Sequence, residues 1–445
     1  MVQAVQGRAN SARPLLSMQE MAFDPADAKA ALTELPHASA VFALYGADAH
    51  AEPYVGRTPN LRARLERLLQ PSAKHPRRLQ LAGRVRRIAW RLTGSEFESL
   101  LTQFSLLEEI YGAKALERMH LRAPAFVRFL GGNPYPRVVV THRPSQREAD
   151  WAYGPFPSRA AAERFCEEML KLFLLRRCTF ELDPDPSYPG CVYSEMKMCL
   201  APCFKGCSDE RYSEEAAGVE KFLATRGESR LVTLRAERER ASANLEFESA
   251  AALHAQVQKV EAVRGLAAEL VRPLSQLRAV ILQASAEPGE VAVFAFYNGR
   301  LRGPAGFSTL GMRIQNEQSG SSSLYAQPMA IEAVPEGREQ GIEGTREQEN
   351  REPGAAAKVA RGMLEARMDE VLAGLAVDVA PPSATERQGY LALLKRWYYR
   401  PEARREGEVF FPGEDGGWPV KAILRGVGRV AAKAMVGSGR ASAPI

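Results

Sequence analysis

Five of the six cysteines of this sequence are concentrated between residues 178 and 207. Four of them fall within a stretch of twenty-six residues: Cys178, Cys191, Cys199 and Cys203. Thiolates that lie this close together hold a zinc ion or an iron–sulfur cluster, or they pair as disulfides. Cys207 follows at once as a possible alternative ligand. Cys166 is expected to lie on a helix and to be buried in the protein core. Which chemistry applies depends on the compartment in which the chain folds.

The hydropathy of the sequence favours a reducing compartment. No run of about eighteen apolar residues is present, which predicts no membrane span and no membrane partner. The first twenty residues lack a continuous apolar stretch, so we expect no secretory signal. A cytoplasmic location follows. Because thiols stay reduced there, metal or cluster binding is favoured over disulfides, and plain buried cysteines are the remaining alternative.

Positive charge is concentrated near the N-terminal end of the chain. The net charge is +6 over 445 residues, and the stretch from Arg57 to Arg91 carries eleven Lys and Arg against one acid, Glu66. Such a stripe suits a phosphate backbone, and it makes Arg57, Arg62 and Arg67 candidate DNA-binding residues. A solvated helix face is the competing interpretation.

Apolar periodicity, turns and caps predict an α+β protein of several domains. A leader at 1–36 precedes a small α/β module at 37–117, with strands near 38–46, 52–57 and 86–93 and helices near 59–69 and 95–117. A connecting region at 118–208 holds the cysteines, strands near 124–132 and 136–143, and a helix near 159–177. A helical region at 209–268 contains a hairpin that turns around Leu245.

The remaining third of the chain reads as three further segments. A strand-rich segment at 269–312 has a turn signal at Asn298-Gly299. The polar segment 313–355 is expected to be a disordered linker, and 356–445 to be a C-terminal helical region with helices near 356–375 and 384–399.

The first module resembles the GIY-YIG nuclease domain. Ala40-Val41-Phe42 and Tyr54-Val55-Gly56-Arg57 stand at the positions of the two family triplets, and Arg64 stands at that of the family arginine. The resemblance implies that a tyrosine helps to deprotonate the attacking water, an arginine stabilises phosphate charge, and a glutamate holds one divalent metal ion.

The match to that family breaks at three positions. Phe42 replaces the first tyrosine, Gln103 falls at the position of the metal-binding glutamate, and Ala115 falls at that of an asparagine. A neutral amide binds Mg²⁺ far less well than a carboxylate does. The sequence therefore predicts a GIY-YIG fold with a degenerate active site, in which Tyr54 and Arg64 remain. Glu108 or Glu109 could replace the missing carboxylate only if the helix register differs from this alignment.

The segment that leads into the cysteines is similar to UvrC, an excinuclease family of bacterial nucleotide excision repair. It comprises Tyr153-Gly154-Pro155-Phe156-Pro157-Ser158 and the helix that ends at Arg177-Cys178. In that family the cysteines ligate a [4Fe–4S] cluster, and Met198-Cys199-Leu200-Ala201-Pro202-Cys203 matches its core. The resemblance implies that Cys178, Cys191, Cys199 and Cys203 hold such a cluster, although zinc suits four thiolates equally well on physical grounds.

Residues 244–254 resemble the UVR motif, a helical hairpin by which UvrC meets UvrB, another component of the excinuclease. The resemblance implies an apolar face that includes Phe247, with Glu246 and Glu248 facing the partner. His254-Ala255 departs from the motif's Arg-Asp, and an ordinary amphipathic hairpin, spanning about 230–265, is the alternative.

The likeness to UvrC fades beyond residue 310. The family's RNase H-like half is not found, and Glu414-Asp415-Gly416-Gly417 is interpreted as a turn. Residues 423–435 have the Gly-x-Gly spacing of a helix–hairpin–helix, which can hold a DNA phosphate. An aromatic and basic cluster, Trp397-Tyr398-Tyr399-Arg400, could stack on bases. Packing inside the protein is the more common role of such residues.

Three functions follow from these observations. The first is a UvrC-like DNA-binding protein of nucleotide excision repair whose nuclease site is degenerate. The second is an active single-incision endonuclease like the short UvrC homologues, and the third is a non-enzymatic adaptor that binds UvrB.

Overall fold

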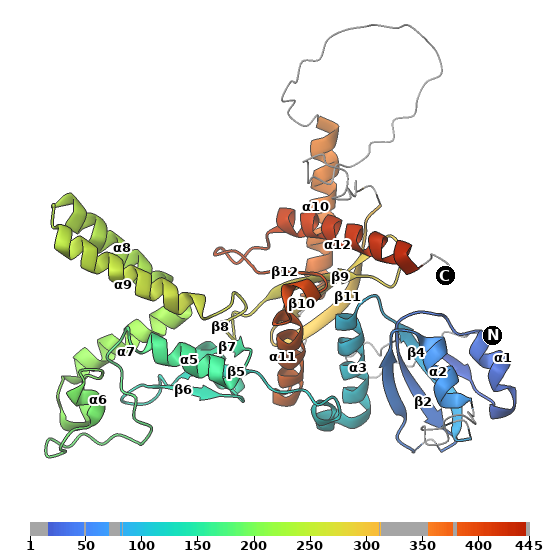
Figure 1. Cartoon of the computed structure of the whole chain (residues 1–445), viewed down its shortest axis with the longest axis horizontal. Coiled ribbons are helices and arrows are strands. Elements are labelled where there is room, and N and C mark those ends of the chain that lie inside the picture. The colour runs from blue at the N-terminus through green and yellow to red at the C-terminus, as the bar shows by residue number, and fades with distance from the viewer. Residues whose placement is uncertain are drawn as a thin grey trace, which may run out of the picture.

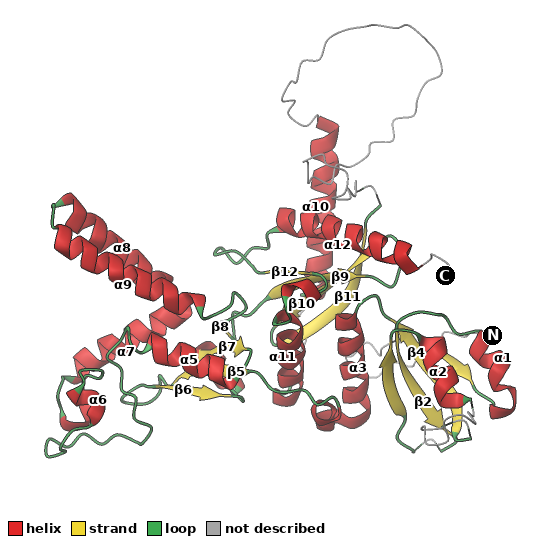
Figure 2. Ribbon diagram, viewed as in Figure 1, coloured by secondary structure: helices red, strands yellow, loops and turns green. Residues whose placement is uncertain are grey.

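The structure is a computed structural model of the whole chain. It describes residues 17–48, 50–70, 81, 83–310, 312, 355–376 and 381–441. In the described part the strands form three sheets of four strands each, and helices pack on them (Figures 1 and 2). No helix in these ranges is long and apolar enough to cross a membrane. The predicted linker, 313–355, lies outside the described residues except for Ala355.

The first sheet has the strand order β1-β4-β2-β3 and is antiparallel throughout. Its strands are β1 (Gln19–Ala22), β2 (Ala40–Gly46), β3 (Tyr54–Thr58) and β4 (Val85–Leu92). The helices of this module are α1 (Ala28–Thr33), α2 (Leu61–Leu69), α3 (Glu96–Tyr111) and α4 (Ala115–Arg118). Asn60 caps α2 and Ser95 caps α3, each by accepting a backbone N–H with its side chain.

The predicted leader at 1–36 is wrong from residue 17 onward. Strand β1 pairs with β4 from Gln19 to Ala22, and Phe23, Leu32 and Leu35 are buried in the module core. Alternation over four residues is too short a signal to identify an edge strand, so the pairing could not be predicted from the sequence.

The second sheet forms the middle of the chain, with the order β6-β5-β7-β8. Its strands are β5 (Ala125–Phe129), β6 (Val138–Thr141), β7 (Ala152–Phe156) and β8 (Arg272–Pro273). Helices α5 (Arg159–Met169), α6 (Val192–Glu195) and α7 (Asp209–Ala224) accompany it. Helix α5 ends at Met169, so the helix predicted near 159–177 is shorter than expected.

Two long helices form an antiparallel hairpin that projects from this middle region (Figure 1). They are α8 (Glu228–Ala243) and α9 (Phe247–Gly265), and the predicted turn lies at Leu245, whose φ is +60°. At the base of the hairpin Leu231, Leu234 and Val257 join the core of the middle region.

The C-terminal unit is built on the third sheet, with the order β11-β10-β9-β12. Its strands are β9 (Ala279–Ala284), β10 (Glu290–Tyr297), β11 (Arg300–Ser308) and β12 (Glu408–Phe410). Helices α10 (Ala355–Leu375), α11 (Ala384–Tyr398) and α12 (Val420–Ala441) pack on it. Asn298 and Gly299 both have positive φ, which confirms the predicted turn between β10 and β11.

One prediction about this unit is wrong. Residues 269–312 and 356–445 were expected as separate segments, but β12 pairs with β9, and α10 and α12 bury the same core. Residues 423–435, whose Gly-x-Gly spacing is that of a helix–hairpin–helix, lie within one continuous helix, α12. A Cβ on Gly426 would lie 2.6 Å from the Cζ of Phe410, so this glycine permits close packing of α12 on β12 and does not form a loop.

The C-terminal unit packs against α3 of the first module. The rings of Phe104 and Tyr390 meet edge to face with centroids 5.3 Å apart. Near the start of α3, Glu96 accepts two hydrogen bonds from the guanidinium of Arg400, at 2.7 and 2.8 Å. Helix α3 is therefore enclosed between the first sheet and α11.

Candidate metal centre

The cysteines lie in an irregular loop between α5 and α7. The loop reverses direction repeatedly, and Gly190, Lys197, Ala201 and Lys205 all have positive φ. Backbone hydrogen bonds fix its two ends, because the Leu200 N–H donates to the Leu174 carbonyl and the Asp185 N–H donates to the Cys203 carbonyl. The loop thus folds back on itself around its own interior.

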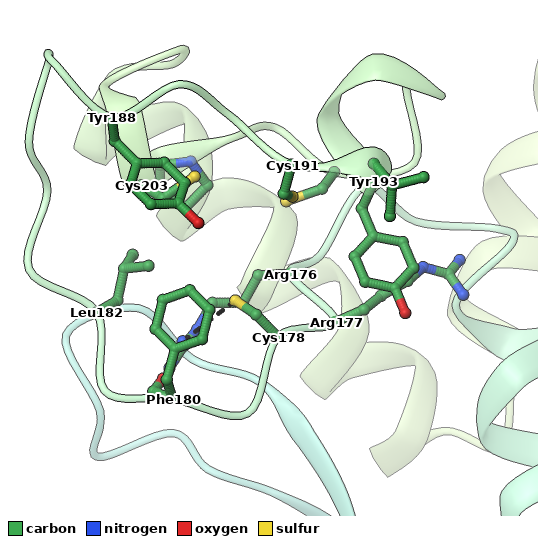
Figure 3. Close-up of a pocket in the computed structure, with 12 residues that line it drawn as sticks. Arg176, Arg177, Cys178, Phe180, Leu182, Tyr188, Cys191, Tyr193 and Cys203 are labelled. Atoms are coloured by element: carbon green, nitrogen blue, oxygen red, sulfur yellow. Dashed lines mark hydrogen bonds between the residues drawn. The ribbon is translucent and has the colours of Figure 1, made fainter.

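All four predicted ligands line one cavity in that interior (Figure 3). The cavity has a volume of about 150 Å³. Its remaining lining is mostly apolar or aromatic, with two arginines: Arg176, Arg177, Phe180, Leu182, Tyr188, Val192, Tyr193 and Pro202. Cysteines from twenty-six residues of chain therefore face a single space that contains few other polar groups.

The four thiols surround this cavity and do not meet at one point. In the described part of the chain, no three cysteine, histidine or acidic side chains are placed to hold a single metal ion. Zinc binds sulfur at about 2.3 Å, so its four thiolates lie within about 4 Å of one another. Four thiols that line one cavity are a donor set for either zinc or an iron–sulfur cluster.

Burial favours the protonated form of the Cys199 thiol. It raises the pKa of Cys199 to about 11, and the thiols of Cys178, Cys191 and Cys203 push it in the same direction. The Ala201 N–H donates a hydrogen bond of 3.3 Å to Cys199 Sγ, which opposes the shift only in part. Since metals bind thiolates, metal binding must displace the proton of the Cys199 thiol, and the affinity for metal therefore rises with pH.

The other two cysteines do not line the cavity. Cys166 is buried in α5 within the core of the middle region, where burial raises its pKa to about 11. Cys207 packs at the edge of that core, and it is not among the residues that line the cavity. The expectation for Cys166 is confirmed, and the geometry favours the first four cysteines over Cys207 as a ligand set.

The first module brings part of its predicted set together. Phe42 and Tyr54 lie on paired strands with ring centroids 6.1 Å apart, and both belong to the core under α2, the helix that carries Arg64. A Cβ on Gly56 would lie 2.7 Å from the Cζ of Phe42. The glycine of the second triplet therefore makes room for the Phe42 ring.

Gln103 and Ala115 lie apart from that group. Helix α3 covers the opposite face of the sheet, where Leu106 packs against Val41 and Ala43. Gln103 lies on α3 one turn before Leu106, and Ala115 is buried in the core shared with the C-terminal unit. Gln103 therefore lies on the helix that covers the face of the sheet opposite to Phe42.

The candidate DNA-binding arginines are at the surface but are partly engaged. Arg57 lies 3.5 Å from Glu96, the carboxylate that Arg400 also holds. Arg62 donates from Nε to the Leu35 carbonyl at 2.6 Å, and Arg67 donates from Nε to the carbonyl one turn before it. Residues 71–80, which continue the basic run, lie outside the described part.

The partner-facing residues predicted for the hairpin lie at its tip. Glu246 and Glu248 are exposed, and Phe247 is 69% exposed. The structure adds Leu245, which is 70% exposed; the sequence indicated it as the turn but not as a partner-facing residue. Two large apolar side chains are therefore presented to solvent at the end of a projecting hairpin.

The aromatic cluster at 397–400 packs inside the protein. Trp397 is buried, and its indole N–H donates to the Glu406 carbonyl, while the Tyr399 hydroxyl donates to the Pro155 carbonyl at 2.9 Å. The expectation that these residues serve packing is confirmed.

Comparison with known families covers the cysteine loop and the hairpin. The model of the UvrC/Cho excinuclease middle domain matches residues 126–222, and that of the UvrB/uvrC motif matches residues 228–263. The central region of this chain is thus similar to the UvrC family in two consecutive parts. The first match runs from β5 to α7 and includes all four cysteines of the cavity, and the second coincides with α8 and α9.

Curated relatives that bear the name UvrABC system protein C agree with this placement. The protein of Alcanivorax borkumensis is 31% identical over 211 residues, which are 47% of this chain and 34% of the relative. Those of Aliivibrio fischeri and Escherichia fergusonii are 27% and 29% identical, and each match covers 54% of this chain and 39% of the relative. The chain thus spans little more than a third of the length of the relatives it matches. No solved structure matches it significantly.

Proposed function

We propose that this chain is a DNA-binding protein of nucleotide excision repair that acts in the manner of UvrC. The observation that carries the proposal is the order of the matched parts, in which a UvrC middle domain with a four-cysteine cavity is followed by a UVR hairpin. The basic face of the first module supports a role on DNA, because its arginines suit a phosphate backbone.

The cysteine cavity is proposed to hold a [4Fe–4S] cluster on Cys178, Cys191, Cys199 and Cys203. Support comes from a donor set of four thiols around one cavity and from a lining with few competing polar groups. When bound, such a cluster supplies iron ions that cross-link the thiolates and that exchange electrons. The chain's own contribution is to hold the loop closed around a space that Phe180, Leu182 and Tyr188 help to line.

The first module is proposed to bind DNA without efficient incision. Phe42 is fully buried and has no hydroxyl, and Gln103 lies on the helix that covers the other face of the sheet. Phosphate binding then depends on Arg57, Arg62, Arg64 and Arg67. An active endonuclease would need a carboxylate at the position of Gln103 and a hydroxyl at that of Phe42, and this chain has neither.

The hairpin is proposed to bind the excinuclease component UvrB through its tip. Exposed Leu245 and Phe247 supply an apolar contact, and Glu246 and Glu248 supply charge around it. A few apolar side chains surrounded by polar groups are typical of specific interfaces.

One experiment separates the candidate functions. The full chain, prepared anaerobically, is tested for binding to lesion-bearing duplex DNA, for nicking of that duplex with Mg²⁺, and for binding to UvrB. We expect binding to DNA and to UvrB with little nicking. Nicking at an ordinary enzymatic rate that Arg64→Ala abolishes would support the active endonuclease, and binding to UvrB without DNA binding would support the adaptor.

A further inference from the structure

Arg176 is the largest side chain that is fully buried in the described part of the chain, with 1% of its surface exposed. It lies two residues before Cys178 and lines the cysteine cavity (Figure 3). A guanidinium removed from water is strongly destabilising unless another group compensates its charge. The structure must therefore provide a partner for this cation.

The hydrogen bonds of Arg176 go mainly to neutral acceptors. Its Nε donates to the Tyr135 carbonyl at 2.8 Å, and its Nη1 donates to the Phe180 carbonyl at 2.9 Å. Its Nη2 lies 3.5 Å from Asn133 Oδ1. Among the described residues no carboxylate forms an ion pair with it, so these contacts satisfy its N–H groups but leave its charge uncompensated.

A neighbour of its guanidinium that can become negative is Cys178. The Nη1 of Arg176 lies 3.6 Å from Cys178 Sγ, a charge-assisted contact if that sulfur is a thiolate. Four thiolates around a metal group carry a net negative charge, and they would supply what the protein side of the site lacks.

We infer that Arg176 is a positioning residue of the cysteine centre, which compensates the charge of the thiolate-bound group and favours its reduced form. The inference rests on the proposed cluster and goes beyond it by naming the residue that sets its charge. Arg176 is held in place for this role, since its backbone N–H donates to the hydroxyl of Tyr212, which in turn donates to the Pro136 carbonyl.

Arg177 provides a matched control. It is adjacent in sequence and lines the same cavity, but it is only half-buried, and its guanidinium donates to the Leu170 carbonyl at 2.7 Å. A general effect of removing an arginine from this loop would appear in both Arg176→Gln and Arg177→Gln. An effect specific to the cysteine centre would appear in Arg176→Gln alone.

The test compares wild type, Arg176→Gln, Arg176→Lys and Arg177→Gln as full-length chains after anaerobic reconstitution with iron and sulfide. Iron content, resistance to a chelator, thermal unfolding with and without the cluster, and reduction potential are measured. We expect Arg176→Gln to lose iron to the chelator about 10–100-fold more readily, as for other residues that support metal ligands. Its reduction potential should shift to more negative values, and Arg176→Lys should restore most of both.

Three outcomes would overturn the inference. One is an Arg176→Gln protein whose chelator resistance and potential match those of Arg177→Gln. Another is an equal loss of stability with and without the cluster, which would indicate a purely structural arginine; if Arg176→Gln does not fold, Arg176→Lys decides. Finally, a wild-type chain that takes up no iron would refute the proposed cluster itself, and the inference with it.

Discussion

Replacing Gly389 by alanine tests the contact between α11 and α3. A Cβ at this position would lie 2.0 Å from the Cζ of Phe104, whose ring is 1% exposed and is held edge to face against Tyr390. Because the ring has no free space, it must move or α11 must retreat. Overpacking of this kind destabilises a core by about 1–3 kcal/mol.

The assay is urea unfolding followed by tryptophan fluorescence, with Gly374→Ala in α10 as the control. A Cβ on Gly374 would meet nothing within 4 Å, so this change should be neutral or stabilise by up to about 1 kcal/mol through helix propensity. Phe104→Leu should partly rescue Gly389→Ala, with a coupling of about 1 kcal/mol. If Gly389→Ala lowers the free energy of unfolding no more than Gly374→Ala does, α11 does not pack against α3 as described.

Three further predictions concern charge and the hairpin. The hydrogen bonds from Arg400 lower the pKa of Glu96. Their stabilisation of the fold is therefore present above the pKa that Glu96 has in the unfolded chain, and it is lost as the pH falls through the pKa of the folded state. We expect Arg400→Gln to destabilise the protein by at most about 1 kcal/mol at neutral pH and to have no effect in acid. The double change Arg62→Gln and Arg67→Gln should weaken binding to all duplexes about equally. It should also reduce the slope of log K against log salt concentration by about two. Phe247→Ala should abolish capture by UvrB with little change in melting temperature.

Each of these has an outcome that contradicts it. A constant effect of Arg400→Gln from pH 7 into acid, measured by urea unfolding, would exclude a titrating pair. Duplex affinity that does not depend on salt, in a titration by fluorescence anisotropy, would exclude phosphate binding. Undiminished capture of UvrB by Phe247→Ala would place that interface elsewhere, with exposed Val232 on α8 as the control substitution.

Local signals in the sequence predicted the local structure well. Apolar periodicity and the break at Leu245 indicated the α8–α9 hairpin, and Asn298-Gly299 indicated the turn between β10 and β11. Spacing alone indicated that Cys178 and Cys203 serve one site, although the shape of the cavity required the fold.

Long-range packing set the limits of sequence-based prediction. The spacing around Gly426 is that of a DNA-binding loop, whereas this glycine allows α12 to approach Phe410. Arg176 was missed because a single arginine before a cysteine carries no signal until its burial is known. Pairing of β12 with β9 joins residues more than a hundred positions apart, which no local pattern encodes.

The most direct test of the account is the metal content of the anaerobically purified chain. We predict about four iron and four sulfide per chain, retained in Cys166→Ser and Cys207→Ser and lost in Cys199→Ser and Cys203→Ser. Stoichiometric zinc without iron, or iron that survives loss of Cys199 and Cys203, would contradict the proposed cluster.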